Sequence, residues 1–393
     1  MKAELASHAG RPALVIVGGG SGHRAQSLTA ACLAEFGHRP RTLTWRDVLR
    51  DPHHLDTALE GADWLRFETP DQDADELAAL HEAGADEAVR LGIHTMPADS
   101  KALIASGAIG SPSQMNLGLH KLVAMACALA DTKGVTTSTR PEDVALAFDK
   151  RHAQAQFRAA GLPVPRSLEG VTDFASLETA MDQARINRVF VKLRHGAAAA
   201  GMVALARHGQ NWRSATTAEI GADGVLRATR RVRTLNTRAE AERLINTLGP
   251  LGLHAEAWIP KIGIQGRAAD VRLVMIGGDV ASVTVRASLH PMTNLHLGGE
   301  RLPLDALTAV IGDAMWDAIC ETARKVARLF PHSDNLGIDI AISADARRHY
   351  VLEANLFGDF VKDAGSDASH LHALAMRHIR HKIAARCMDR HAA

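Results

Sequence analysis

The sequence has little net charge, few cysteines and no long apolar run. Its 45 lysines and arginines nearly balance 44 aspartates and glutamates, and the formal net charge of +1 argues against binding nucleic acid or membrane surfaces by bulk electrostatics. No apolar stretch is long enough to cross a bilayer, and residues 1–8 lack the apolar region of a signal peptide. The four cysteines are far apart, and none forms a Cys-x-x-Cys pair. We therefore expect a cytoplasmic protein with no membrane or nucleic-acid partner.

A zinc-binding pattern is also lacking. The chain has 21 histidines, and His290 and His296 are the two whose proximity most invites a metal interpretation. Their spacing fits no common zinc motif and no cysteine accompanies them, so a structural metal is not expected.

Lysine is scarce in this chain. Ten of the 45 basic residues are lysine, which leaves 45 − 10 = 35 arginines. A compact ammonium differs in use from a planar guanidinium, so a lysine inside an apolar strand or at a helix start needs a specific reason. Lys150 and Lys192 occupy such positions.

The length and the apolar pattern predict more than one domain. At 393 residues with 46% hydrophobic content, the chain exceeds one ordinary core and suggests two or three domains. Strands are expected at 13–17, 41–45 and 64–68, with helices that end near residue 36 and span 75–91 and 115–130. A polar stretch at 136–143 breaks this pattern. We expect an N-terminal α/β domain that ends near residue 140.

A glycine-rich turn follows the first expected strand. Residues 18–22 read Gly-Gly-Gly-Ser-Gly, which invites a dinucleotide-binding interpretation and hence an NAD-dependent oxidoreductase. His23 stands where the third glycine of that motif belongs, and no acidic residue closes a strand about twenty residues later. The favoured alternative is a tight turn in an accessory α/β domain.

The second half of the chain reads as strands with a few helices. The expected strands are 188–193, 253–259, 270–276 and 280–286, and the expected helices are 239–248, 313–329 and 369–388. Gly277, Gly278 and Asp279 join the third and fourth of these strands in the manner of a hairpin.

An oxygen-rich cluster is expected near the end of the sequence. Glu353 and Asn355 are two apart on one expected strand and so project to one face, and Asp339 on the neighbouring segment can join them. Two carboxylates and an amide oxygen suit Mg²⁺, which keeps few protein ligands and takes its other oxygens from water and phosphate. The alternative for either acid alone is a solvated charge at a strand edge.

A phosphate-binding loop is expected after Lys192. Lys192 lies on an apolar strand that leads into a small-residue loop with Gly196, four alanines and Gly201. Such a loop can bring backbone N–H groups to phosphates while the ammonium offsets their charge. Lysine precedes the loop, so this is not a Walker A motif. A hinge would explain the glycines but not Lys192. Taken by itself, Lys150 would be interpreted as an ordinary surface lysine. Together with Lys192 it would form a pair of lysines that hold the phosphates.

The order of these parts resembles the ATP-grasp superfamily, in its glutathione-synthetase-like carboxylate–amine ligase branch. The resemblance covers about residues 148–359, over half of the chain. It rests on Asp149-Lys150 with Gly161-Leu162-Pro163-Val164-Pro165, Val191-Lys192 with its loop, Glu256-Ala257-Trp258-Ile259-Pro260, Asp270-Val271-Arg272, Arg286 with Asn294 and Gly298-Gly299, and Asp339 with Glu353-x-Asn355. Six elements in the family's order make a stronger indication than any one of them.

The resemblance implies a fold and an activity. The fold would be α/β (α+β): an N-terminal α/β domain at 1–140 would be followed by two α+β lobes, at 141–255 and 256–393. ATP would bind between the two lobes. The activity would be ATP-dependent formation of an acyl phosphate from a carboxylate, then attack by an amine of an amino acid or peptide, with release of ADP and phosphate. The partners would be those small-molecule or peptide substrates, ATP with two Mg²⁺ ions, and a second copy of the chain in a homodimer.

The resemblance also assigns residues to roles. Lys150, Lys192, Gly196 and Gly201 would bind phosphates, the linker at Glu256, Trp258 and Ile259 would meet adenine through its backbone, and Asp339, Glu353 and Asn355 would bind Mg²⁺. Arg286 would stabilise the transferring phosphoryl group and the later oxyanion. Arg272 could hold the substrate carboxylate, although a cross-strand ion pair with Asp270 or another carboxylate is the equal alternative.

Two departures from the family pattern bear on this transfer. Ala197 to Ala200 stand where members of the family often carry serines and more glycine. After Asn355, the segment Leu356-Phe357-Gly358-Asp359 stands where the family more usually has small residues or a proline. A second functional class remains, a non-catalytic ATP-binding regulatory or scaffold protein of the same fold. The sequence names neither substrate.

Overall fold

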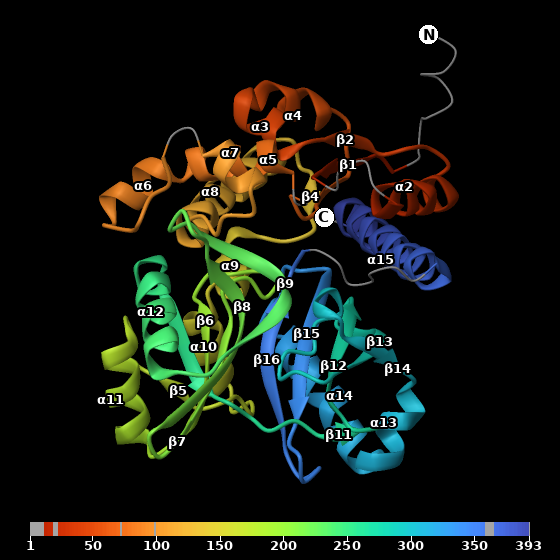
Figure 1. Cartoon of the computed structure of the whole chain (residues 1–393). Helices are drawn as coiled ribbons and strands as arrows, with labels where there is room; N and C mark the ends of the chain where they lie inside the picture. Colours follow the sequence, from red (N-terminus) through yellow and green to blue (C-terminus); the bar gives the residue numbers. More distant parts are fainter. Residues whose placement is uncertain (1–11, 19–22, 71–72, 98–99, 358–364, 393) are drawn as a thin grey trace.

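The computed structural model describes residues 12–18, 23–70, 73–97, 100–357 and 365–392. It contains one parallel sheet near the start of the chain and two antiparallel sheets, which lie side by side below it in Figure 1. This is the α/β class expected from the sequence. Within the described residues, no helix is both long and apolar enough to cross a membrane.

The first sheet is parallel and has the order β2-β1-β3-β4. Its strands are β1 (Leu14–Val17), β2 (Arg41–Leu43), β3 (Trp64–Phe67) and β4 (Thr136–Thr137). The helices in this part of the chain are α2 (His23–Phe36), α3 (Trp45–Arg50), α4 (Pro52–Ala58), α5 (Ala74–Ala83), α6 (Ala85–Arg90), α7 (Lys101–Ala105) and α8 (Pro112–Thr132). The single helix expected at 75–91 is two helices, because Gly84 ends α5 and precedes α6.

A helix from the far end of the sequence covers one face of this sheet. Helix α15 (Gly365–Ala392) packs beside α2, as Figure 1 shows. Met376 and Ile379 are fully buried with Leu14 and Ile16 of β1. Trp64 of β3 completes the contact. The parallel sheet is therefore finished by residues remote from it in sequence.

The second sheet is antiparallel, with the order β5-β10-β6-β7-β8-β9. Its strands are β5 (Ser167–Leu168), β6 (Arg188–Leu193), β7 (Val203–His208), β8 (Asn211–Ile220), β9 (Leu226–Leu235) and β10 (Leu253–Ala257). It is accompanied by α9 (Pro141–Phe148), α10 (Lys150–Ala159), α11 (Phe174–Ala184), α12 (Arg238–Leu248) and the short η2 (Gly249–Leu251). Strand β10 ends two residues earlier than expected, so Trp258 and Ile259 lie in a connecting segment.

The third sheet has the order β14-β13-β12-β15-β16, with β11 paired to β12. Its elements are β11 (Gly263–Ile264), β12 (Arg267–Ile276), β13 (Asp279–Ser288), η3 (Leu295–Leu297), β14 (Glu300–Leu302), α13 (Leu304–Ile311), α14 (Asp313–Ala327), β15 (Asn335–Ile342) and β16 (His349–Asn355). The hairpin expected at residues 277–279 joins β12 to β13.

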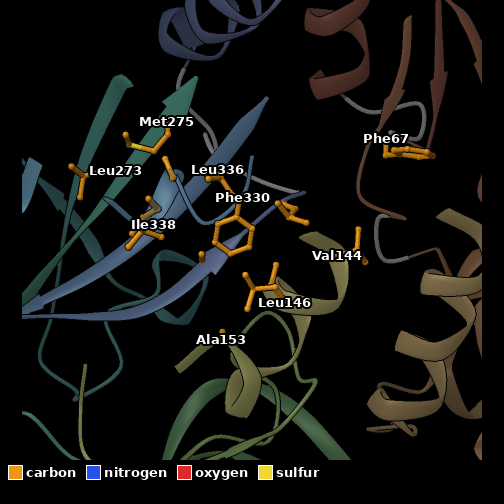
Figure 2. Packing of buried hydrophobic residues seen from close by; sticks show 14 of the residues in the cluster. Phe67, Val144, Leu146, Ala153, Leu273, Met275, Phe330, Leu336 and Ile338 are labelled. Atoms are coloured by element: carbon orange, nitrogen blue, oxygen red, sulfur yellow. The ribbon is translucent and has the colours of Figure 1, made fainter. Parts of the chain in front are cut away.

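Alternation along these strands divides the third sheet into an apolar and a charged face. Leu273 and Ile338 belong to the core that also contains Phe330 and Leu146, and Figure 2 shows these side chains together. The intervening residues point the other way, because successive side chains of a strand alternate between the faces. The alternation therefore gathers the polar residues of β12, β13, β15 and β16 on the opposite side.

Candidate active site

We call this opposite side the charged face; it consists of Asp270, Arg272, Arg286, Asp339, Glu353 and Asn355. Cross-strand register aligns its members in rows. Arg272 of β12 lies opposite Asp339 of β15, and Asp339 lies opposite Glu353 of β16. Asp270 lies opposite Arg286 of β13. The three metal-site residues expected from the sequence are thus on adjacent strands.

Two arginines hold the carboxylate of Asp339. Arg272 donates from Nε to Oδ1 at 2.6 Å and from Nη2 to Oδ2 at 2.8 Å, and Arg286 donates from Nη1 to Oδ2 at 3.2 Å. Burial raises the pKa of Asp339, but Arg272 and Arg286 outweigh it and keep the pKa below its usual value. Of the two alternatives for Arg272, the structure contains the cross-strand ion pair.

A second carboxylate orders Arg286. Asp270 accepts from Arg286 Nε at 2.8 Å and from Lys261 Nζ at 2.7 Å, and Lys261 also donates to Thr293 Oγ1 at 2.9 Å. Asp270 and Lys261 are buried, and burial lowers the pKa of Lys261. The sequence interpretation did not include Lys261. Its signal was available, because it is one of the scarce lysines and directly follows the expected linker.

The donor set suits magnesium. Asn355 donates from Nδ2 to the carbonyl oxygen of Gly337 at 3.4 Å, which leaves its Oδ1 as an acceptor. Together with Asp339 and Glu353 this makes an oxygen-only set on two adjacent strands, suited to Mg²⁺ that also takes phosphate oxygens. Among the described residues, no group of three or more His, Cys, Asp or Glu could hold a metal by itself.

Lys192 pairs with a buried glutamate. Lys192 on β6 forms an ion pair with Glu256 on β10, and both side chains are buried. Glu256 also accepts from Gln154 Nε2 and contacts His254 Nε2 at 3.2 Å. Burial raises the pKa of Glu256, but Lys192 and His254 outweigh it and hold the pKa at about 2. The glutamate expected near adenine thus serves as the counter-ion that fixes Lys192.

Lys150 connects the second sheet with the third. It is the first residue of α10 and follows Asp149, the N-cap of that helix. Its ammonium donates to Glu353 Oε1 at 3.2 Å and to the carbonyl oxygen of Gly196 at 2.5 Å. The structure therefore brings one expected phosphate-binding lysine into contact with an expected metal ligand.

We call residues 194–202, between β6 and β7, the flap. Gly201 has a φ of +69°, and a Cβ on it would lie 2.7 Å from Leu193 Cδ1, so the backbone here requires glycine. A Cβ on Gly196 would meet Leu193 Cβ at 2.8 Å. Ala198 and Ala199 also have positive φ values, 51° and 56°. The alanines that depart from the family pattern therefore include two in the left-handed region that glycine prefers.

The flap contacts the third sheet's loops. His296 Nε2 lies 2.9 Å from the carbonyl oxygen of Ala198. Ala199 and Met202 pack with Met292 and Leu297 in one small apolar cluster. This cluster also contains Phe190 and Trp258, whose ring centroids are 5.5 Å apart.

The linker after β10 offers a backbone donor. The N–H of Trp258 donates a hydrogen bond to the carbonyl oxygen of Arg188 at 3.1 Å. The Arg188 guanidinium lies 5.9 Å from the centroid of the Trp258 ring. Within the part of the chain that the structure describes, the N–H of Ile259 has no backbone acceptor.

A histidine at the start of the flap also escaped the sequence interpretation. His195 Nδ1 lies 2.8 Å from Ser113 Oγ of α8, and its Nε2 lies 3.8 Å from Asp149. Burial lowers the pKa of His195 to about 4, so the imidazole is neutral near pH 7. Arg194 pairs with Asp149 through Nε at 2.9 Å. The flap is thus tied both to α10 and to the N-terminal part of the chain.

Gly18, which directly follows β1, has a packing explanation. Gly18 has a φ of +91°, and a Cβ on it would meet Trp45 Nε1 at 2.3 Å and the carbonyl oxygen of Glu68 at 2.6 Å. Gly18 is required by the packing of α3 and β3 against β1. Residues 19–22 of the turn, and Gly358-Asp359 after β16, lie outside the described residues.

Solved structures with this architecture match most of the chain. The ATP-grasp ligase PsnB, complexed with a minimal precursor, is 16% identical over 94% of this chain and 99% of its own, with a TM-score of 0.52. The chain has the ATP-grasp fold. The macrocyclase MdnC of Microcystis aeruginosa, bound with precursor peptide MdnA, matches at 11% identity, 93% and 99% coverage and a TM-score of 0.51.

Other ATP-grasp structures match equally well. The D-alanine–D-alanine ligase of Bacillus anthracis is 10% identical over 97% of this chain and 99% of its own, with a TM-score of 0.51. Identities this low show the ATP-grasp fold alone. No protein-family model and no curated protein matches the sequence.

Proposed function

We propose that the chain is an ATP-dependent carboxylate–amine ligase of the glutathione-synthetase-like branch. Residues 1–140 would form its N-terminal domain, and lobes at 141–255 and 256–393 would clasp ATP with two Mg²⁺ ions. The observation that carries the proposal is the row of Arg272, Asp339 and Glu353 across three adjacent strands, with Lys150 contacting Glu353. A structural sheet has no need for so many charges on one face.

The basic residues have a common task in this proposal. Lys192 is held by Glu256 on the strand that leads into the flap, and Lys150 contacts the flap at Gly196. Both would offset phosphate charge, while Gly196 and Gly201 let the flap backbone approach closely. Trp258 and Ile259 would meet adenine through the linker backbone. Asp339, Glu353 and Asn355 would hold Mg²⁺, which would supply positive charge to offset that of the phosphates.

Arg286 is placed to stabilise developing charge. Its guanidinium is buried and oriented by Asp270 and Asp339 before any substrate arrives, so little reorganisation is needed during reaction. It would stabilise the phosphoryl group as the substrate carboxylate attacks ATP. It would then stabilise the oxyanion formed when the amine adds to the acyl phosphate, and collapse of that oxyanion would re-form the carbonyl and release phosphate. No protein nucleophile is required.

Peptide substrates fit this proposal best. PsnB was solved with a minimal precursor and MdnC with a precursor peptide, although D-alanine–D-alanine ligase has the same fold. The substrate class we propose is therefore a carboxylate and an amine carried by a peptide or an amino acid. The site would act in peptide modification in the first case.

Nucleotide binding and ADP release test the proposal separately. ATP with Mg²⁺ should raise the melting temperature, since a ligand at a hundredfold excess over its Kd stabilises the native state by about 2.7 kcal/mol. A screen of peptide and amino-acid pairs for ADP release, with mass detection of product, tests the ligase reaction. A shift with NAD and none with ATP and Mg²⁺ would favour the oxidoreductase alternative instead. Binding without release for every pair would favour a regulatory ATP-binding protein.

A further inference from the structure

Arg272 binds the same carboxylate, that of Asp339, that a divalent cation would bind under the proposed function, on which this inference rests. Both oxygens of Asp339 accept a hydrogen bond from the same guanidinium, at 2.6 and 2.8 Å. Arg286 takes a further position on Oδ2. A metal ion bound to this carboxylate would need a lone pair of an oxygen that already has a cationic partner.

Among the described residues of the site, cations already outnumber carboxylates. Three carboxylates, those of Asp270, Asp339 and Glu353, are in contact with four cations. These are Lys150, Lys261, Arg272 and Arg286. Asp270 and Asp339 are buried, where Coulomb interactions are stronger than in water. A divalent cation alone would raise the excess positive charge from one to three, whereas a cation that arrives with a nucleoside triphosphate brings net negative charge.

We propose that Arg272 guards Asp339 against divalent cations and leaves it only when metal and nucleotide arrive together. The guanidinium displaced from Asp339 is then available to the carboxylate of the substrate. Arg272 can make its two bonds to only one carboxylate at a time, and both partners would use the same bidentate geometry. The site would therefore load metal and nucleotide before the substrate carboxylate.

The neighbouring strands favour this exchange over a rigid pair. The side chain of Arg272 is 21% exposed, whereas that of Arg286 is 6% exposed. Arg286 also binds the buried Asp270. Arg272 is the more exposed of the two guanidiniums, and Arg286 stays as the buried cation beside Asp339.

Manganese titration followed by electron paramagnetic resonance tests the inference without turnover. The wild-type protein should bind Mn²⁺ weakly alone and tightly with ADP or ATP. Arg272→Gln should bind Mn²⁺ alone roughly ten- to a hundredfold more tightly than wild type, because one cation beside the metal is removed. Arg272→Lys keeps the charge without the bidentate bonds and should lie between the two.

Arg267→Gln is the matched control. Arg267 is on the same strand and pairs with the exposed Glu300 at 3.1 Å, away from the charged face. Its removal should leave Mn²⁺ affinity unchanged with and without nucleotide.

Failure of the inference and failure of the proposed function give different results. If wild type binds Mn²⁺ with nucleotide but Arg272→Gln shows no gain for Mn²⁺ alone, the guard is overturned while the nucleotide site stands. If wild type binds no Mn²⁺ even with ATP, the proposed function fails. If circular dichroism shows that neither Arg272 variant folds, the pair is structural and the inference is likewise overturned.

Discussion

The ammonium of Lys150 lies 3.2 Å from Oε1 of Glu353, although 203 residues separate them in the sequence. Lys150 begins α10, and Glu353 lies near the end of β16. The contact joins the helix that precedes the flap-bearing sheet to the sheet with the charged face. Any ligand that binds Lys150 through phosphate and Glu353 through metal would take the place of this ion pair.

Substitution of the two acidic metal-site candidates, Glu353 and Asp339, should change the free energy of unfolding by different amounts. Glu353 is 30% exposed in its ion pair, so Glu353→Gln should change the free energy of unfolding by less than about 1 kcal/mol. Asp339→Asn removes the buried carboxylate that Arg272 and Arg286 share, although Asp270 still binds Arg286, and should cost about 3–5 kcal/mol. Both should lower metal-dependent ADP release by orders of magnitude. Denaturant unfolding and an ADP assay measure the two effects; unchanged release in Glu353→Gln would make Glu353 an edge charge.

Lys192→Met should lose both stability and ATP affinity, for separable reasons. It leaves the Glu256 carboxylate buried without its main cation, which should cost about 3–5 kcal/mol. The double variant Lys192→Met/Glu256→Gln removes the unpaired charge and should recover much of that stability. ATP affinity, measured by calorimetry, should stay low in both variants, and Lys192→Arg should also bind weakly because the larger guanidinium replaces a compact ammonium in a buried ion pair. Wild-type affinity in the double variant would remove Lys192 from the nucleotide site.

Substitution by glycine should stabilise the protein at Ala199 of the flap and destabilise it at Ala200. Ala199 has a φ of 56°, where a Cβ costs about 1–2 kcal/mol, whereas glycine adds about 0.4–1 kcal/mol of unfolded-state entropy. Ala199→Gly should therefore raise the free energy of unfolding by roughly 0.5–1 kcal/mol. Ala200 has no positive φ, so Ala200→Gly should lower it. Equal effects of the two substitutions in urea unfolding would show that the left-handed backbone at Ala199 carries no strain.

Stability should fall as the pH drops from about 6.5 to about 4, and His195 should carry part of the loss. Burial holds the pKa of His195 at about 4, below the ordinary 6.5, so in this window the unfolded chain binds a proton that the folded protein does not. Full stability is therefore present above pH 6.5. His195→Asn should flatten the slope of unfolding free energy against pH, whereas His152→Asn, at an exposed site, should not. His372, whose pKa burial also lowers to about 4, should account for a further part.

The sequence predicted the strands because their patterns are local. The apolar run around Lys192 is a property of a few consecutive residues, and β6 lies where it was expected. Glu353 and Asn355 on one strand, beside Asp339, followed from the same reasoning, and the register bears out their proximity.

The counter-ions were not predictable in the same way. Glu256 faces Lys192 because β10 lies beside β6. This relation depends on which distant strands pair, and no short pattern encodes that choice. The ion pair of Arg272 with Asp339 was one of two open alternatives for the same reason. Lys261 reaches Asp270 through the local pairing of β11 with β12.

The position of α15 has a consequence for how the protein is made. Cys32 of α2 and Met376 of α15 are in contact, Sγ to Sδ at 3.2 Å, across a separation of 344 residues. A ribosome synthesises the parallel sheet first, but one apolar face of that sheet stays uncovered until α15 has been translated. The earliest strands are thus among the last to be completed, so a nascent chain must protect this face from aggregation during elongation. Full burial of Trp64, followed by its fluorescence, should appear only after release of α15.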